Sequence, residues 1–110
     1  MRDMPYIVTR TWYPTHKTPE VAKRYLEVLE KFPPDEKLIE PVVPASIKAT
    51  ERGIASLGIS LVKEGKLEEA LSRTIESMVM YHEIEGYEYS VEVQYTAVEA
   101  LAFIGMSIPE

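Results

Sequence analysis

Residues 37–62 have the sequence KLIEPVVPASIKATERGIASLGISLV, and their pattern indicates two neighbouring strands of a sheet. The first half of this stretch is rich in strand-forming residues but is interrupted by Pro41 and Pro44. Because proline has no N–H to donate to a neighbouring strand, this half is predicted to be an edge strand or to contain a bulge. After a turn at 51–53, residues 54–62 alternate between large apolar and small side chains. This pattern indicates a second strand with one buried face and one close-packed or cavity-lining face.

Two further strands are predicted, one before and one after this stretch. Residues 6–13 are rich in β-branched and aromatic side chains and stop at Pro14. Residues 87–95 alternate between Tyr or Val and polar residues, which is the clearest strand pattern in the chain. The chain therefore contains four predicted strands.

A first helix is predicted between the first and second strands. Thr18 is expected to be its N-cap and Pro19 its first helical residue, since proline is compatible with that position. Pro33 and Pro34 end it, because proline interrupts the helical hydrogen bonds. Spacings of three and four residues place one apolar stripe on this helix: Val21, Ala22, Tyr25, Leu26 and Leu29.

A second helix is predicted from residue 67 to about residue 84, with the apolar stripe Leu67, Ala70, Leu71, Ile75, Met78, Val79 and His82. Residues 96–99, with the sequence TAVE, fit a capping box. A short final helix is therefore expected over 100–104, ended by Gly105.

The order strand, helix, strand, strand, helix, strand predicts an α+β fold. We expect a single ferredoxin-like βαββαβ domain over 1–110, with a four-stranded antiparallel sheet and both helices on one face. The first and third strands are expected in the centre, which leaves the proline-containing strand at an edge. Ile54, Tyr6, Val8 and Trp12 are then expected on a face without a partner. Such an apolar face predicts a sheet-to-sheet homodimer or a higher oligomer.

The chain resembles the dimeric α/β-barrel superfamily in residues 6–12 (YIVTRTW), in its paired helices and in residues 95–101 (YTAVEAL). This superfamily includes proteins similar to antibiotic-biosynthesis monooxygenases and muconolactone isomerases, and the likeness is greatest to small uncharacterised archaeal and bacterial members. The resemblance implies a pocket for a small apolar or aromatic ligand, between sheet and helices or inside the barrel formed by a dimer. It implies no particular reaction, because no catalytic motif of the superfamily is present.

The charge of the chain argues against several classes of partner. Lys and Arg number 12 and Asp and Glu number 18, so the net charge is 12 − 18 = −6. A compact chain of that charge has no electrostatic attraction to nucleic acid or to anionic membranes, and neither is expected as a partner. The N-terminus has no apolar targeting segment, so a cytoplasmic location is expected.

The chemistry available to the chain is also limited. No Cys is present, which excludes disulfides, thiolate nucleophiles and Cys-based zinc sites. The two His residues and the scattered Glu residues match no metal-ligand spacing, so no metal and no cofactor are expected. The absence of Asn, the single Gln and the abundance of Glu and Lys are typical of thermophilic proteins.

Four residues are candidates for ligand binding. Arg10 and Trp12 share one face of a central strand, where a guanidinium beside an indole is able to hold a carboxylate and stack an aromatic ring. Glu92 is the expected counter-charge of Arg10, and an ion pair at a dimer interface is the alternative role of the two. His16 follows the first strand and is either a general base or an exposed loop residue.

Three functions are compatible with these features. The first is a homo-oligomeric protein that binds a small ligand without catalysis. The second is a cofactor-independent monooxygenase or isomerase that uses His16 or the pair Arg10 and Glu92. The third is a purely structural assembly module, in which the partner subunit fills the open sheet face.

Overall fold

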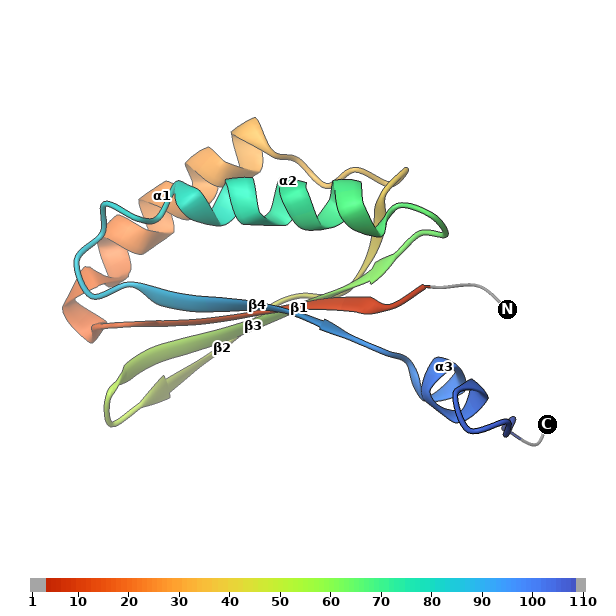
Figure 1. Ribbon diagram of the computed structural model, residues 1–110. Coiled ribbons are helices and arrows are strands. Elements are labelled where there is room, and N and C mark those ends of the chain that lie inside the picture. The colour runs from red at the N-terminus through yellow and green to blue at the C-terminus, as the bar shows by residue number, and fades with distance from the viewer. Residues whose placement is uncertain (1–3, 109–110) are drawn as a thin grey trace.

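The computed structural model describes residues 4–108. It is an α+β protein with an open, four-stranded antiparallel sheet, three α-helices and one short 3-10 helix (Figure 1). In chain order the elements are β1 (Tyr6–Tyr13), η1 (Thr15–Lys17), α1 (Thr18–Lys31), β2 (Ile39–Thr50), β3 (Gly53–Val62), α2 (Leu67–Val79), β4 (Glu88–Gln94) and α3 (Ala97–Ala102).

The strands lie in the order β2-β3-β1-β4, so the first and third strands are central as predicted. The prolines of β2 act as expected: β2 is an edge strand, and its pairing with β3 shifts register between Pro41 and Val43 and again between Val43 and Ser46. Gly53 begins β3 at a φ of 129°, where an added Cβ would lie 2.4 Å from the backbone oxygen of Tyr13. Only glycine fits this turn.

Helices α1 and α2 cover the same face of the sheet, as expected from the crossover rule (Figure 1). The core lies between these layers in two clusters. The first consists of Tyr13, Val21, Val28, Met78, Tyr81 and Ile84, and the second of Ile7, Leu38, Val62 and Ala70. Ile7 and Tyr13 thus show which face of β1 meets the helices, a choice that the alternation of apolar residues left open.

The predicted stripe of α1 is partly wrong. Val21 and Val28 are the buried residues of this helix, whereas the side chain of Leu26 is 64% exposed. The N-terminus of α1 differs as well, because Lys17 holds the N-cap position and the Thr18 hydroxyl donates a hydrogen bond to the Thr15 carbonyl at 2.6 Å. Thr18 itself has helical backbone angles, φ −51° and ψ −47°, so it does not take the extended conformation typical of an N-cap.

The second helix is shorter than predicted. It ends at Val79, after which the backbone bonds to carbonyls three residues back, as in Tyr81 N–H to Met78 O at 3.0 Å. These tighter turns bring both Tyr81 and Ile84 into the core. His82 is exposed in these turns rather than on an apolar helix face, and its Nε2 lies 2.7 Å from the hydroxyl of Tyr89.

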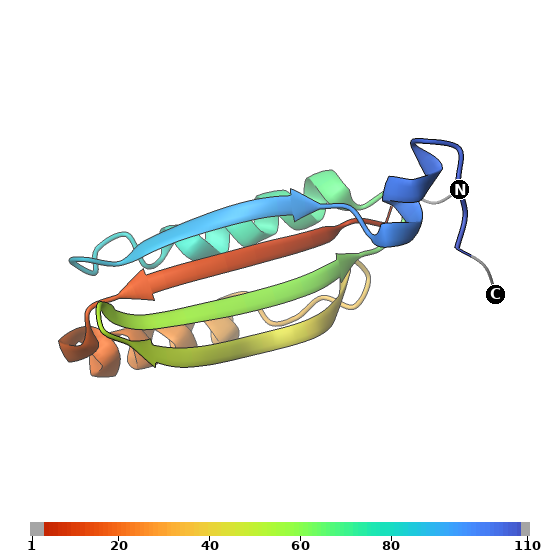
Figure 2. The same ribbon diagram turned by 90° about the horizontal axis from the view of Figure 1, so that it is seen from below.

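The face of the sheet opposite α1 and α2, here called the open face, is seen directly in Figure 2. Its central strands carry Tyr6, Val8, Arg10 and Trp12 of β1, paired with Leu61, Ile59, Leu57 and Ala55 of β3. Ile54 was predicted on this face, but it packs against the core cluster around Tyr13 on the helix side. Val8 is 2% exposed even without a second layer.

Candidate functional site

A cavity of about 470 Å³ lies between the sheet and the two helices. Its floor is formed by the helix side of β1 and β3, and its walls by α1, α2 and β2. The residues that line it include Ile7, Thr9, Thr11, Tyr13, Val21, Tyr25, Val28, Pro44, Ile54, Ser56, Gly58, Ser60, Thr74, Ser77, Met78, Tyr81 and Tyr87. The volume lies within the range of about 300–1,000 Å³ that is typical of small-molecule sites.

Small residues on β3 make this cavity possible. Ser56, Gly58 and Ser60 occupy alternate positions of the strand and face the helices. A large side chain at any of these positions would fill the space beneath α1. The alternation in the sequence predicted a close-packed or cavity-lining face on this strand, and the register places its small residues on the face opposite Arg10 and Trp12.

The polar groups of the cavity are hydroxyls. Thr11, which is 6% exposed, forms a hydrogen bond through its Oγ1 with the Oγ of Ser56. The hydroxyl of Thr74 donates to the Ala70 carbonyl at 2.9 Å, and that of Ser77 to the Thr74 carbonyl at 2.7 Å. Within the described chain, the lining contains no Asp, Glu, Lys, Arg or His. The cavity therefore offers hydrogen bonds and apolar contact, but no counter-charge for an ionised ligand.

Stacked tyrosine rings line one end of the cavity. The rings of Tyr81 and Tyr87 are stacked with centroids 4.5 Å apart, and Tyr13 lies 6.0 Å from Tyr87. Burial raises the pKa of Tyr81 to about 12, and burial also raises the pKa values of Tyr13 and Tyr87. These phenols are therefore neutral at physiological pH and act as apolar walls with a hydroxyl group.

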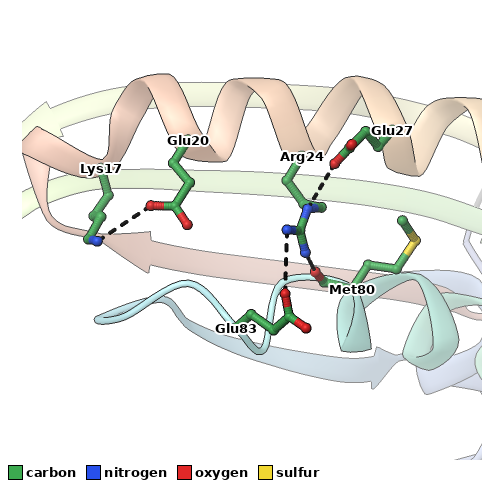
Figure 3. A network of polar contacts seen from close by, with 6 residues as sticks. All are labelled: Lys17, Glu20, Arg24, Glu27, Met80 and Glu83. Atoms are coloured by element: carbon green, nitrogen blue, oxygen red, sulfur yellow. Dashed lines mark hydrogen bonds and ion pairs between the residues drawn. The ribbon is translucent and has the colours of Figure 1, made fainter.

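Polar contacts of one arginine anchor the segment that carries these tyrosines (Figure 3). The guanidinium of Arg24, on α1, donates to the backbone carbonyl of Met80. Its Nε lies 2.9 Å from Glu27 Oε1, and its Nη2 lies 3.7 Å from Glu83 Oε2. One side chain thus ties α1 to the turns after α2, beside Tyr81.

The predicted pairing of Arg10 and Glu92 is confirmed on the open face. Arg10 Nε lies 3.4 Å from Glu92 Oε2, and both side chains are almost half exposed, at 45% and 42%. Hydrogen bonds from Gln94, at 3.1 Å, and Ser90, at 3.2 Å, lower the pKa of Glu92 below its ordinary value, and the charge of Arg10 lowers it further. The carboxylate is already satisfied by three neighbours.

The other two candidate residues lie apart from the cavity. Trp12 belongs to the open face, is 43% exposed and borders a shallow hollow at the end of the sheet with Lys48, Arg52 and Glu88. His16 is exposed in η1. None of the four predicted ligand-binding residues lines the cavity of 470 Å³.

Sequence reasoning missed the groups that α1 and α2 bring to the cavity, such as Tyr25, Thr74 and Ser77. A hydroxyl on a helix has no periodic signature that separates a cavity-lining position from a solvent-exposed one. The one usable signal was the run of small residues on β3, and it identified the strand but not the face.

Among residues 4–108, no group of three or more His, Asp or Glu side chains is arranged to hold a metal ion. No helix in the described range is long and apolar enough to cross a membrane. Comparison with known proteins finds no significant match to a family model, to a curated protein or to a solved structure.

Proposed function

We propose that this protein is a homodimer that binds a small, uncharged apolar or aromatic molecule in the cavity between the sheet and helices α1 and α2. The observation that carries the proposal is the cavity itself, about 470 Å³ in volume, with an uncharged lining. An unfilled cavity of this size lowers the stability of the fold, because the groups around it lose packing contacts. A bound ligand would restore those contacts.

The lining selects the chemistry of the ligand. The rings of Tyr81 and Tyr87 favour a flat apolar group, and the hydroxyls of Thr11 and Ser56 favour a ligand that carries one hydrogen-bonding atom. An aromatic acid is a poorer ligand than its neutral counterpart, because no cation in the lining compensates a buried carboxylate. This replaces the initial expectation that Arg10 would hold a carboxylate.

We further propose that the chain belongs to the dimeric α/β-barrel superfamily and forms a homodimer. The strand order β2-β3-β1-β4, with both crossing helices on one face, supports a ferredoxin-like arrangement and membership of the dimeric α/β-barrel superfamily. The apolar side chains of the open face, Leu57, Ile59 and Leu61 among them, support a homodimer in which two such faces meet.

Thermal unfolding with a panel of paired neutral and acidic aromatic compounds tests the ligand proposal. A ligand at about 100 times its Kd stabilises the folded state by about 2.7 kcal/mol, a shift of several degrees for a domain of this size. We expect the neutral member of each pair, for example benzyl alcohol against benzoate, to give the larger shift. A panel in which no compound raises the melting temperature would favour the purely structural module.

A cavity-filling variant assigns the binding to this cavity. An added Cβ at Gly58 meets only the Pro44 oxygen at 3.4 Å and the Val43 oxygen at 3.8 Å, which is ordinary van der Waals contact. Gly58→Val is therefore expected to fold and to abolish the ligand-induced shift. Ser46→Val is the matched control, because Ser46 pairs with Leu57 and lies on the open face. Equal ligand shifts in both variants would place the ligand elsewhere.

A further inference from the structure

The C-terminal residues 95–108, here called the C-terminal arm, leave the sheet at the end of β4. Helix α3 lies beyond the end of the strands and below them, on the opposite side from α1 and α2 (Figure 1). Figure 2 shows it at the same end of the sheet as the start of β1. The arm therefore stands out from the layer of strands on the side of the open face.

The arm is held in this direction by one buried carboxylate. Thr96 and Glu99 form the predicted capping box, in which the Glu99 backbone N–H donates to Thr96 Oγ1 at 3.2 Å and the Thr96 N–H donates to Glu99 Oε1 at 3.1 Å. The other carboxylate oxygen of Glu99 accepts the backbone N–H of Met4 at 2.8 Å. Glu99 is 4% exposed, so α3 is joined to the start of the chain rather than loosely attached.

The arm exposes an unusual amount of apolar surface. Its exposed large apolar residues are Tyr95 (56%), Val98 (46%), Phe103 (67%), Ile104 (69%), Met106 (57%) and Ile108 (48%). Glu99 is the single charged residue between positions 95 and 108, and it is buried. Monomeric soluble proteins rarely expose so many large apolar side chains in one short segment, and this segment has no exposed charge with which to recognise a nucleic acid or an anionic lipid.

A second copy of this chain would cover both the C-terminal arm and the open face. Packed sheets lie about 10 Å apart, so a second sheet against the open face would occupy the layer beside which the arm stands. Taking on the order of 150 Å² for each fully exposed side chain, the six residues of the arm offer roughly 500 Å². A stable interface buries about 800 Å² on each partner, so the arm would supply more than half of it and the open face the remainder.

We infer that the C-terminal arm is the clasp of a two-fold dimer, in which the arm of each copy packs against the open face of the other. The inference rests on the proposed homodimer and adds the segment that holds the dimer together. A two-fold arrangement makes the contact reciprocal, so that both arms are buried by a single association step.

Sedimentation equilibrium of the full chain tests this with matched variants. Ile104→Ser removes an apolar side chain from the arm, and Leu26→Ser removes one of similar exposure, 64% against 69%, from the outer side of α1. We expect Ile104→Ser to raise the Kd of the dimer at least tenfold and Leu26→Ser to leave it within twofold of the wild type. Ile108→Ser serves as a second arm variant, and circular dichroism verifies that each variant is folded.

The outcomes separate the two proposals. A wild-type chain that is monomeric at millimolar concentration overturns the homodimer and the clasp together. A wild-type dimer whose Kd is unchanged by both arm variants, or is raised equally by Leu26→Ser, overturns the clasp and leaves the homodimer standing.

Cross-linking gives a direct second readout, because the natural chain has no cysteine. An untagged chain with Ile104→Cys is mixed with a tagged chain that carries either Leu61→Cys or Trp12→Cys, at the two ends of the open face. A disulfide between the two chains with one of these partners is expected, and the reactive position gives the relative orientation of the sheets. No mixed disulfide with either position overturns the clasp.

Discussion

The carboxylate of Glu99 accepts a hydrogen bond at 2.8 Å from the backbone N–H of Met4, which lies 95 positions earlier in the chain. This contact joins α3 to the residues that lead into β1. A helix of six residues does not persist alone in water, because nucleation costs more than so few hydrogen bonds return. The position of α3 therefore depends on the side chain of Glu99.

Replacing Glu99 with Ala is expected to destabilise the folded state by about 1–3 kcal/mol, since the N–H groups of Met4 and Thr96 lose their acceptor. Urea unfolding measures the change. Glu99→Gln keeps one acceptor oxygen and is expected to cost less. The control is Glu88→Ala, at an exposed position of β4. Equal losses in Glu99→Ala and Glu88→Ala would contradict the anchoring role.

Replacing Arg24 with Ala is expected to cost about 1.5–3 kcal/mol, the usual contribution of a hydrogen bond to a charged group, because the Met80 carbonyl loses its donor. Arg24→Lys keeps the charge but not the fork of donors, so an intermediate loss is expected. Lys23→Ala removes a neighbouring exposed cation and serves as the control. Urea unfolding gives the free energy of unfolding of the three variants. A loss of stability in Lys23→Ala as large as that in Arg24→Ala would contradict a specific role of Arg24 in joining α1 to the turns after α2.

At alkaline pH the buried tyrosines are expected to make the fold sensitive to base. The folded pKa of Tyr81, about 12, lies above the ordinary value of 10.0. Its contribution to stability is therefore complete below about pH 10 and is lost as the pH rises through the folded value. Ultraviolet difference absorbance of the phenolate follows the titration. In Tyr81→Phe the loss of stability with rising pH should become shallower, and an unchanged slope would show that Tyr81 does not contribute to it.

At acidic pH, Glu92 is expected to lose its contribution to stability as the pH falls, the opposite direction from Tyr81. Its folded pKa is lowered from the ordinary value of 4.5, so the stabilising effect is present above that value and is lost as the pH falls through the folded one. Carboxyl-detected NMR titration gives the pKa directly. Gln94→Ala is expected to raise it towards 4.5, since the hydrogen bond from Gln94 is the largest cause of the shift. Ser46→Ala, elsewhere on the open face, is expected to leave it unchanged; a shift of equal size in both variants would exclude a specific role of Gln94.

Local rules of the chain predicted the strands well. The first strand was predicted over 6–13 and is observed over the same residues, because β-branched and aromatic side chains and Pro14 define both its composition and its end. Pro41 and Pro44 identified the edge strand, since a missing N–H excludes a central position whatever the rest of the fold does. The capping box of Thr96 and Glu99 was also visible, although α3 begins at Ala97 rather than at Ala100.

The errors concern packing between elements. Leu26 fits the apolar spacing of α1, yet its side chain is 64% exposed and Val28 is buried against the core instead. Helix α2 ends at Val79, and the next carbonyl, that of Met80, accepts a hydrogen bond from Arg24, which lies 56 residues earlier in the chain. No pattern within a short window contains such a partner.

The amino-acid pattern was enough to predict the order of the elements, the edge position of β2, the pairing of Arg10 with Glu92 and the small side chains along β3. These follow from backbone sterics, proline chemistry and the two-residue period of strands, all of which act between near neighbours or across one strand pair. Three features became visible only in the folded chain: Ser56, Gly58 and Ser60 face the helices, a cavity lies above them, and α3 stands clear of the sheet. Those outcomes depend on which of two apolar faces each strand presents to α1 and α2, and the free energy of that choice is summed over contacts between residues far apart in the chain.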